Sequence, residues 1–531
     1  MRRFSIVCWG VALVTLTSWL PAGLWAATGD GKSTADHSKF EQLQQTFQSG
    51  PEVTAACLEC HTEAASQLHK TSHWTWAFEN PVTGQTLGKK NVINNFCVAT
   101  ATNWPRCTSC HIGYGWKDET FDLTSEKNVD CLVCHDTTTT YKKFPVGAGH
   151  PNYEPKEWPP KSGKIRQPPD LTKIAQSVGK PSRDTCGACH FYGGGGNGVK
   201  HGHLDSSMHK PTRETDVHMD AAGLNFTCQT CHTTGGNEIS GSRYVTKASD
   251  NRGVVIPGQA DQNRASCESC HSNTPHAEAA NPKLNQHTDK IACVTCHVPE
   301  FARGGRKTKM WWDWSSAGKK DEQGKPLLIN DEDGYPIYDF KKGDFKWEAN
   351  VVPTYRWFDG DVRYTLLSDT IDDTAVVPIN SVKGSYADPN SRIWPFKVMR
   401  GRQPYDKQQK ILAVPHLFGK DEDAYWKSFD WGKAVTAGLA ARGYEFSGDL
   451  GFVETEYYWP VTHMVAPKEN TLGCDDCHSR NGRLAGVEGF YMPGRDRFEW
   501  IDMIGWLLVV GTFGGVSLHG LARIFTARKG G

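Results

Sequence analysis

The chain has 531 residues, of which 38% are apolar and 22% charged, and Lys+Arg equals Asp+Glu at 59 each. Its length allows roughly two to four domains, but the apolar fraction is low for so large an interior, so something besides side chains must help to fill it. A formal charge of zero gives no reason to expect a nucleic acid partner or a generally basic docking surface.

The first 27 residues have the layout of a secretory signal peptide. Arg2 and Arg3 precede an apolar stretch, and small residues follow at Ala26 and Ala27. We expect residues 1–27 to be removed by cleavage near Ala26, which implies export. An uncleaved N-terminal anchor is the alternative.

Eight Cys-x-x-Cys-His motifs account for sixteen of the 18 cysteines. In c-type attachment the two thiols form thioethers with haem and the adjacent histidine binds iron, so the three residues must be close in sequence. Zinc would need a second cysteine pair at a set spacing, and a disulfide framework has no use for the histidine. We therefore expect eight covalently bound haem c groups. The attachment cysteines are Cys57, Cys60, Cys107, Cys110, Cys131, Cys134, Cys186, Cys189, Cys228, Cys231, Cys267, Cys270, Cys293, Cys296, Cys474 and Cys477, and the proximal histidines are His61, His111, His135, His190, His232, His271, His297 and His478.

The first seven motifs lie between Cys57 and His297, and glycine and proline are scattered through the connecting segments. With so little chain per cofactor, the porphyrins must supply much of the apolar interior. We predict short helices that follow or carry a motif, long loops and little sheet. The expected fold class is mainly α with much irregular structure, built around a packed haem array, plus one C-terminal transmembrane helix.

Residues 301–470 contain no motif but are rich in tryptophan and tyrosine, as in "MWWDWSS" and "EYYWP". Such aromatic clusters more often pack a core or cover haem edges than bind a ligand. The stretch "KPLLINDEDGYPIYDF" predicts a small hairpin around "DEDG". We expect this region to supply distal iron ligands.

The C-terminal segment predicts a membrane anchor. No ionised side chain occurs from Met503 to Leu521, a stretch that covers about 28 Å as a helix and so spans a bilayer core. Arg523, Arg528 and Lys529 follow, which favours a cytoplasmic tail and places the rest on the periplasmic side of the cytoplasmic membrane.

These features give the expected domain organisation. It comprises a signal peptide (1–27), a haem-array domain with seven motifs (28–300), the aromatic-rich region (301–470), the eighth motif (471–498), the transmembrane helix (500–525) and a cytoplasmic tail (526–531).

Thirteen histidines lie outside the motifs, and one of them, His519, falls in the membrane span. The other twelve exceed the eight distal positions, so full bis-histidine coordination is possible and counting proves no open site. Groupings such as "HKTSH" place two imidazoles on one helical face. Our candidates for second iron ligands are His73, His150, His201, His218, His276, His287, His416 and His463.

Cys97, ten residues before Cys107, is the cysteine that remains in the mature chain without a haem. A lone buried thiol is usually an inert small hydrophobe. The alternative is a reactive thiol beside an iron.

The eight-motif spacing together with "CLECHTEAA", "HWTW", "CGACHFYGGGGNGVKHG", "CVTCHVPEF" and "VMRGRQPYD" resembles the octahaem tetrathionate reductase family of c-type cytochromes. The resemblance runs from His37 to Arg483. It implies a haem core that overlaps those of hydroxylamine oxidoreductase and pentahaem nitrite reductase. It also implies an active site at the haem on Cys107, Cys110 and His111, with a distal lysine and a neighbouring aspartate.

The resemblance directs attention to "PDLTKIAQSVGKPSRDTCGACH", residues 169 to 190. Its "DLTK" keeps an aspartate three residues before a lysine, which implies catalytic roles for Lys173 as iron ligand and Asp170, with Lys180 and Lys200 as alternatives. Cys97 corresponds to a family cysteine near that haem, which favours the reactive role. A liganding lysine must be deprotonated against a usual pKa of about 10.4.

The resemblance implies a periplasmic respiratory reductase that passes electrons through bis-histidine haems to the lysine-ligated haem, where it reduces tetrathionate, or nitrite or hydroxylamine. Two rival functions stay open. One is a pure electron conduit between a membrane quinol-oxidising cytochrome b and periplasmic acceptors, and the other is a hydroxylamine-oxidoreductase-like enzyme.

The anchor departs from the soluble members of that family and bears on the electron donor. Gly511 and Gly515 form a Gly-x-x-x-Gly face that permits close helix contact, and His519 needs a partner in lipid. We hypothesise docking against a cytochrome b-type, quinol-oxidising subunit. The expected substrate is a small inorganic anion.

Overall fold

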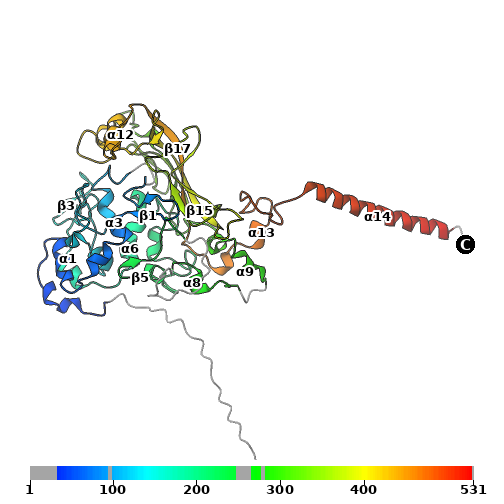
Figure 1. Cartoon of the computed structure of the whole chain (residues 1–531), viewed down its shortest axis with the longest axis horizontal. Coiled ribbons are helices and arrows are strands. Elements are labelled where there is room, and N and C mark those ends of the chain that lie inside the picture. The colour runs from blue at the N-terminus through cyan, green and yellow to red at the C-terminus, as the bar shows by residue number, and fades with distance from the viewer. Residues whose placement is uncertain (1–32, 94–98, 247–264, 277–280, 529–531) are drawn as a thin grey trace, which may run out of the picture. The chain divides into compact units, whose positions relative to one another are not determined.

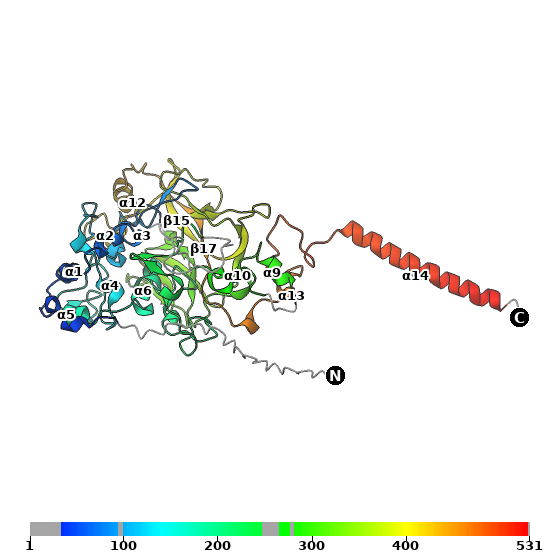
Figure 2. The same cartoon turned by 60° about the horizontal axis from the view of Figure 1, so that its bottom comes forward.

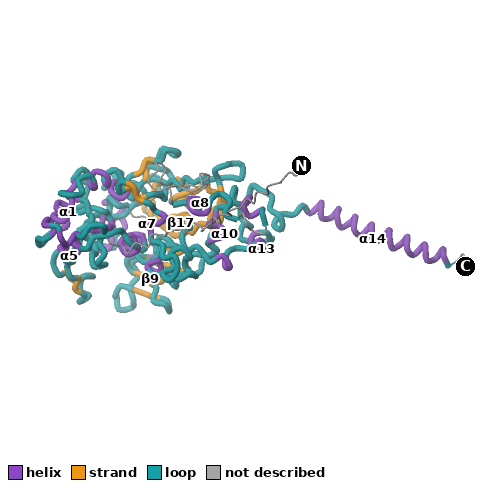
Figure 3. The backbone as a smooth tube through the Cα atoms, turned by 90° about the horizontal axis from the view of Figure 1, so that it is seen from below, coloured by secondary structure: helices purple, strands orange, loops and turns teal. Residues whose placement is uncertain are grey.

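The computed structural model of the chain describes residues 33–93, 99–246, 265–276 and 281–528. The expected signal peptide (1–27) and Cys97 lie outside the described residues. Up to residue 300 the chain is a succession of short helices, two-residue strand pairs and long loops, as Figure 1 and the tube in Figure 3 show.

The attachment motifs lie in, or directly after, short helical turns. Because residues three and four apart share one face of a helix, such a turn brings both thiols and the imidazole to the same side. The expectation of short helices that carry the motifs is confirmed. The turns are α1 (Gly50–Leu58), η3 (Cys107–Cys110), α4 (Leu132–His135), α6 (Arg183–His190), α7 (Cys228–Cys231), α8 (Glu268–His271), α10 (Cys293–His297) and α13 (Cys474–Cys477).

The remaining short helices connect or cover these turns. They are η1 (His37–Lys39), η2 (Glu41–Leu43), α2 (Ala64–Leu68), α3 (Ser72–Thr75), η4 (Glu126–Asn128), α5 (Leu171–Gln176), η5 (Gly193–Gly195), η6 (Ser206–His209), α9 (Lys283–His287), η7 (Trp314–Ser316), α11 (Tyr425–Ser428), α12 (Trp431–Ala440) and η8 (Lys468–Asn470). Small antiparallel pairs are β1 (Phe78–Glu79) with β2 (Thr86–Leu87), β3 (Lys156–Glu157) with β4 (Ile165–Arg166), β5 (Thr234–Gly235) with β6 (Glu238–Ile239), and β12 (Val362–Tyr364) with β14 (Asn380–Val382).

The expectation of little sheet is wrong for the motif-free region, which forms a nine-stranded mixed sheet. The path is β13-β17-β15-β7-β10-β9-β8, and β11 and β16 both pair with β15. The long strands β15 and β17 run antiparallel side by side (Figure 1). The strands are β7 (Thr308–Asp313), β8 (Leu328–Asn330), β9 (Pro336–Asp339), β10 (Gly343–Glu348), β11 (Thr354–Phe358), β13 (Val377–Pro378), β15 (Arg392–Asp406), β16 (Ile411–Leu412) and β17 (Leu450–Pro460).

The physical reason for this error lies in β15. Its sequence, "RIWPFKVMRGRQPYD", mixes apolar with charged residues and so gives neither an apolar run nor a clean alternation. Yet almost the whole strand is buried, including Lys397 at 0% and Gln403 at 5% exposure. The predicted hairpin around "DEDG" is confirmed, because β8 and β9 pair with Leu328 opposite Asp339.

The sheet packs directly on the motif-bearing part of the chain. Its core contains residues of the seventh motif turn, such as Val294, together with Val199 from the segment after the fourth motif. The amide of Ala292, just before α10, donates to the carbonyl of Ile393 in β15 at 3.0 Å. In Figure 2 α10 lies near β15, and α9 and α13 lie near α10.

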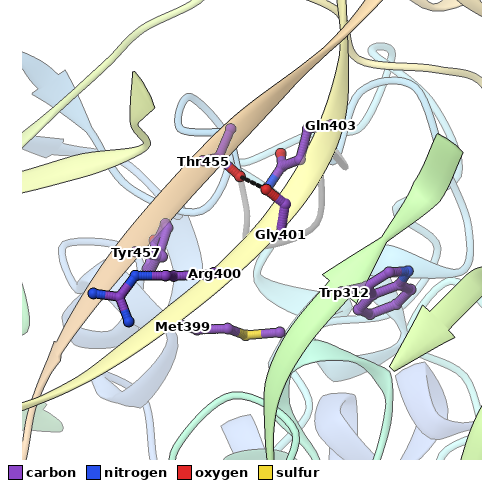
Figure 4. Close-up of a pocket in the computed structure, with 7 residues that line it drawn as sticks. All are labelled: Trp312, Met399, Arg400, Gly401, Gln403, Thr455 and Tyr457. Atoms are coloured by element: carbon purple, nitrogen blue, oxygen red, sulfur yellow. Dashed lines mark hydrogen bonds between the residues drawn. The ribbon is translucent and has the colours of Figure 1, made fainter. Parts of the chain in front are cut away.

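A shallow pocket lies where β7, β15 and β17 meet (Figure 4). A Cβ on Gly401 would lie 2.3 Å from the carbonyl oxygen of Trp312, so only glycine permits this approach of the two parallel strands β7 and β15. The Thr455 hydroxyl donates to the Gly401 carbonyl at 3.3 Å. Because no attachment motif lines it, we assign this pocket to sheet packing. Its lining residues are Trp312, Met399, Arg400, Gly401, Gln403, Thr455 and Tyr457.

The C-terminal helix α14 (Glu499–Ala527) is a candidate membrane anchor by length and composition. Its most apolar window has a mean hydropathy of 1.7, and none of that window is buried in the described structure. Trp506 and Phe513 are 70% and 74% exposed. Side chains of this size are stable in such exposure only in lipid or against a partner.

A protein truncated after Phe498 should no longer bind membranes and should be soluble without detergent. The truncation removes the only exposed apolar helix of this length among the described residues. We expect unchanged visible absorption of the attached haems, and recovery in the soluble fraction after ultracentrifugation. A truncated protein that still sediments with membranes would show that another segment anchors it.

Candidate haem array and active site

The sixteen motif cysteines form no disulfide bonds with one another. Instead, sulfur atoms of different motifs approach each other, which places the motif turns in contact. The sulfurs that interact directly are Cys57 with Cys131, Cys110 with Cys189, Cys186 with Cys228, and Cys267 with Cys293. Further neighbours are Cys134 with Cys186, Cys231 with Cys267, and Cys296 with Cys477.

These contacts give the motifs a spatial order. The first, third, fourth, fifth, sixth, seventh and eighth motifs follow one another in a line, and the second joins this line at the fourth. The sulfurs of Cys267 and Cys293 and a carboxylate oxygen of Glu268 lie within 4.8 Å of one another. Because both cysteines belong to attachment motifs, we assign this group to the array and not to a separate metal site.

Six motif histidines each face a histidine from elsewhere in the chain. Two imidazoles that bind one metal from opposite sides have ring centres roughly 6 Å apart, because each metal–nitrogen bond is about 2 Å long and each ring centre lies about 1 Å behind its nitrogen. All six pairs have this spacing. The ring-centre distances are 6.3 Å for His37–His61, 6.2 Å for His73–His190, 5.9 Å for His218–His271, 6.2 Å for His232–His463, 6.1 Å for His276–His297 and 6.1 Å for His287–His478.

Backbone carbonyls orient several of these rings. Nδ1 of His232 lies 2.9 Å from the carbonyl oxygen of Ser240, and Nδ1 of His478 lies 3.0 Å from that of Pro493. A ring nitrogen held in this way leaves Nε2 for a metal, as in most histidine metal sites. Spacing and orientation together show that the residues present fit an axially ligated haem iron.

His463 shows how the sheet region reaches the array. It follows β17, and the next residues are fixed by Asp216, whose carboxylate accepts the Met464 amide at 2.9 Å and the Val465 amide at 3.1 Å. Nδ1 of His463 lies 3.0 Å from Nδ1 of His203. The return of the chain through β17 thus brings an imidazole opposite His232.

Not every candidate histidine is placed in this way. Among the described residues, His150, His201 and His416 do not face a motif histidine, whereas His37, which was outside our candidate set, does. The three have other partners: the hydroxyl of Tyr153 lies 2.7 Å from Nδ1 of His150, the ring of Trp459 lies 4.9 Å from that of His201, and the carboxylate of Asp421 lies 3.1 Å from Nε2 of His416. For these three histidines, iron ligation stays a prediction from the sequence.

Two motif histidines, His111 and His135, have no opposing imidazole among the described residues. His111, of the second motif, is completely buried. Its ring contacts those of Trp74, Trp76 and Trp116 at 5.0, 5.3 and 4.7 Å between centres. Its Nε2 lies 2.7 Å from the Trp74 carbonyl oxygen, and its Nδ1 is buried without a hydrogen-bond partner. The nitrogen without a partner is therefore Nδ1 in His111, whereas Nδ1 is the held nitrogen in His232 and His478.

Lys89 and Lys143 lie beside the second motif and are held in place. The Lys89 ammonium donates to the Cys107 carbonyl at 3.3 Å. Lys143 forms an ion pair with Asp130 at 2.9 Å, with side-chain exposures of 8% and 0%, and also donates to the His111 carbonyl. Because a buried charge is tolerated only when paired, the ion pair fixes Lys143.

Lys200 differs from these two lysines. It is 8% exposed and interacts electrostatically with Cys110 of the second motif. Burial lowers the pKa of Lys200 well below its usual range, and the charges of Arg243 and Lys89 lower it further. Its ammonium forms no hydrogen bond or ion pair within the part of the chain that the structure describes.

Lys173 and Asp170 have a structural role in this geometry. The Asp170 carboxylate accepts the Lys173 backbone amide at 2.9 Å and thereby caps the N-terminus of α5. Helix α5 packs against α1, η1 and η2. Across the described ranges we find no hydrogen bond or ion pair between the Lys173 side chain and the second motif. The spacing in "DLTK" thus also fits helix capping, and within the described residues it is Lys200 that interacts with Cys110 of the second motif.

Lys397 fixes the backbone that carries Lys200. This completely buried lysine of β15 donates to the carbonyls of Val199 at 2.9 Å and Lys200 at 3.1 Å, and to the Thr308 hydroxyl at 2.6 Å. Burial lowers its pKa to about 7. No sequence signal marks this residue, because its partners are 89 or more positions away.

Replacing Lys397 by methionine should cost about 1–3 kcal/mol of unfolding free energy, because two buried carbonyls lose their donor. We also expect altered ligand binding at the second motif, since the Lys200 backbone is released. Thermal unfolding and ligand titration of the attached haems measure both effects. Lys309→Met, which removes a second buried lysine whose ammonium lies 3.9 Å from the Trp312 ring centre, is the control. Equal effects of both variants on ligand binding would contradict a specific role for Lys397.

The motif turns and the opposed imidazoles define a multihaem c-type cytochrome. Comparison with known proteins agrees. Residues 309–481 match the family described as "Cytochrome c bacterial", and residues 56–136 match "Cytochrome c554 and c-prime". An uncharacterised protein of Archaeoglobus fulgidus is 25% identical in an alignment 293 residues long that covers 46% of this chain and 96% of that protein.

A solved structure is a nearer relative. The octahaem cytochrome c of Shewanella oneidensis is 44% identical, with a TM-score of 0.73 over 86% of this chain and 95% of that one. The chain belongs to the octahaem cytochromes c. Membership agrees with a redox role and with covalently bound haem c.

Proposed function

We propose that this protein is a membrane-anchored, outward-facing reductase of a small inorganic oxyanion, with its active site at the second motif. One observation carries the proposal: six motif histidines face an opposing imidazole, whereas His111 is buried among tryptophans with Lys200 nearby. An iron site that lacks a second imidazole and is surrounded by cationic residues suits an anion that must approach the metal.

We assign the six opposed histidines, His37, His73, His218, His276, His287 and His463, as second axial ligands. Their ring spacing supports the assignment, and so does their distribution over six different motifs. The line of motif contacts runs from the eighth, which lies just before α14 in the sequence, to the fourth and second. It supports entry of electrons near the membrane and their delivery at the second motif.

We assign Lys200 as the displaceable amine at the second motif in preference to Lys173. Its burial and its lack of an acceptor both favour the neutral amine, the form that can bind a metal. When Lys200 is released to an anionic substrate, it regains its proton and becomes a cation beside that substrate. Lys173 stays the alternative that the family resemblance implies.

Tetrathionate is the substrate that the family resemblance favours. When bound, the haems supply one-electron transfer. Two electrons break the central sulfur–sulfur bond of tetrathionate, and two thiosulfate ions leave without a proton. Reduction of nitrite or hydroxylamine would also need protons, for which Lys89 and Lys143, whose ammonium groups contact the backbone of the second motif, are candidate donors.

We further propose that α14 docks against a quinol-oxidising, cytochrome b-type membrane subunit. The exposed Trp506 and Phe513, and the open space around Gly511 and Gly515, support a helix partner, and His519 lies on the same helix. Purification in mild detergent should retain a subunit with a b-type haem spectrum. Recovery of fully active, quinol-reducible protein without such a subunit would contradict this partner.

Turnover of the purified protein tests the proposed function. Tetrathionate, nitrite and hydroxylamine are supplied in parallel with a reduced viologen dye as electron donor. We expect reduction of at least one, with tetrathionate fastest. No turnover of any of the three, with all haems reducible by the dye, would leave the pure electron conduit. Oxidation of hydroxylamine with a dye acceptor, without any reduction, would favour the hydroxylamine-oxidoreductase-like alternative.

A further inference from the structure

Two basic side chains contact the same buried indole beside the second motif. The Lys200 ammonium lies 4.7 Å, and the Arg243 guanidinium carbon 5.2 Å, from the ring centre of Trp459. Trp459 is 3% exposed and belongs to β17. Lys200 is also the lysine that interacts with Cys110. Three parts of the chain thus meet at one point. They are β17 with Trp459, the segment after the fourth motif with Lys200, and the segment that ends at residue 246 with Arg243.

The hydrogen-bond donors at this point lack acceptors. Nε of Arg243 and Nε1 of Trp459 are both buried without a hydrogen-bond partner. Arg243 donates from Nη2 to the Tyr364 hydroxyl at 3.3 Å, also contacts the Tyr244 hydroxyl, and stacks on the Tyr244 ring at 4.7 Å. In the described parts of the chain, no carboxylate forms an ion pair with Arg243 or Lys200.

Such a cluster is costly for the protein alone. A buried, unpaired donor loses the hydrogen bonds that water gave it, and the two basic groups repel each other whenever Lys200 is protonated. Cation–π contact with Trp459 offsets part of this cost but supplies no acceptor. A group with several negatively charged oxygens would satisfy all three donors, because it accepts hydrogen bonds from several directions.

We propose that Lys200, Arg243 and Trp459 form a binding subsite for the oxyanion group of the substrate, a sulfonate-like or thiosulfate-like end. Arg243 is the permanent cation of the subsite, and its unused Nε edge donates to oxygen. The Trp459 indole N–H donates to the same group. The inference rests on the proposed function, because it gives the second-motif site the residues that recognise a divalent anion.

The same three donors could instead bind the carboxylate of a haem propionate. Binding experiments distinguish a substrate oxyanion from a propionate. A substrate subsite binds added anion with an affinity that depends on Arg243, whereas a propionate contact changes a reduction potential and leaves anion affinity unchanged.

The test uses the full-length, oxidised protein in detergent, titrated calorimetrically with thiosulfate at constant ionic strength. Arg243→Gln should weaken thiosulfate binding about tenfold or more, the loss of one charge-assisted hydrogen bond, and should raise the KM for tetrathionate more than it lowers kcat. Trp459→Phe, which keeps the ring but removes the N–H, should weaken binding by a smaller factor. Arg213→Gln is the matched control, because Arg213 is an exposed arginine paired with Glu469.

Unchanged thiosulfate affinity in Arg243→Gln would overturn the subsite, and so would a shifted reduction potential at unchanged affinity, which would identify a propionate partner. Failure of the proposed function is distinguishable from failure of the subsite. Arg243-dependent thiosulfate binding without turnover would keep the subsite and reject the reductase. Turnover that is unchanged in Arg243→Gln would keep the reductase and reject the subsite.

Discussion

Replacing Lys200 by leucine should lower kcat/KM for tetrathionate about 100-fold or more, comparable with the loss of one preorganised charge-stabilising group in other enzymes. Leucine has no amine and no positive charge, and unlike methionine it has no sulfur that could bind a haem iron. The six opposed imidazole pairs do not involve Lys200, so their spectroscopic signals should be unchanged. Steady-state rates and magnetic resonance of the same sample measure both effects.

The matched control for this substitution is Lys173→Leu. Lys173 lies on α5 behind the cap made by Asp170, so its loss should change the rate by less than twofold. The reverse result, full activity in Lys200→Leu and loss of activity in Lys173→Leu, would restore the assignment that the family resemblance implies and reject the one made from the structure.

Replacing Glu268 by glutamine should destabilise the protein by about 3–5 kcal/mol, because it leaves the buried guanidinium of Arg392 without its counter-ion. The side chains of Arg392 and Glu268 are 6% and 10% exposed and are in direct contact. They join the sixth motif turn to the first residue of β15. Denaturant unfolding followed by the absorption of the attached haems measures the loss.

The control for this variant is Glu469→Gln, which breaks the ion pair of Glu469 with Arg213. The side chains of Glu469 and Arg213 are 51% and 50% exposed. Exposed ion pairs contribute little to the free energy of unfolding because water screens their charges. We therefore expect no measurable change in stability. Similar destabilisation by the two substitutions would mean that burial does not determine the effect and that the Arg392 contact has no special role.

The attachment chemistry was predictable from sequence because it is local. Cys-x-x-Cys-His fits within one helical turn, so the motif determines both the cofactor and the short helix that carries it. The hairpin of β8 and β9 was predictable for the same reason, since its turn residues stand between two short apolar stretches. The nine-stranded sheet was not, because β15 buries Lys397 and Gln403 among apolar residues and so has no simple pattern.

The candidate active site depends on contacts far apart in sequence. His463 reaches His232 across 231 positions only because β17 returns along β15. His37 and His61 are closer, but nothing in the residues around His37 marks it as a ligand. In "DLTK" the aspartate–lysine spacing fits a helix cap as well as a metal site. The chain therefore gives the number of haems directly, whereas it gives their second ligands only through the fold.

Spectroscopy of the oxidised protein, by low-temperature magnetic resonance and near-infrared magnetic circular dichroism, tests the central claim most directly. We predict at least six haems with two imidazole ligands and one with imidazole and an amine, whose signal changes when thiosulfate is added and disappears in Lys200→Leu. Eight haems that all carry two imidazoles, with no response to the anion, would contradict the account.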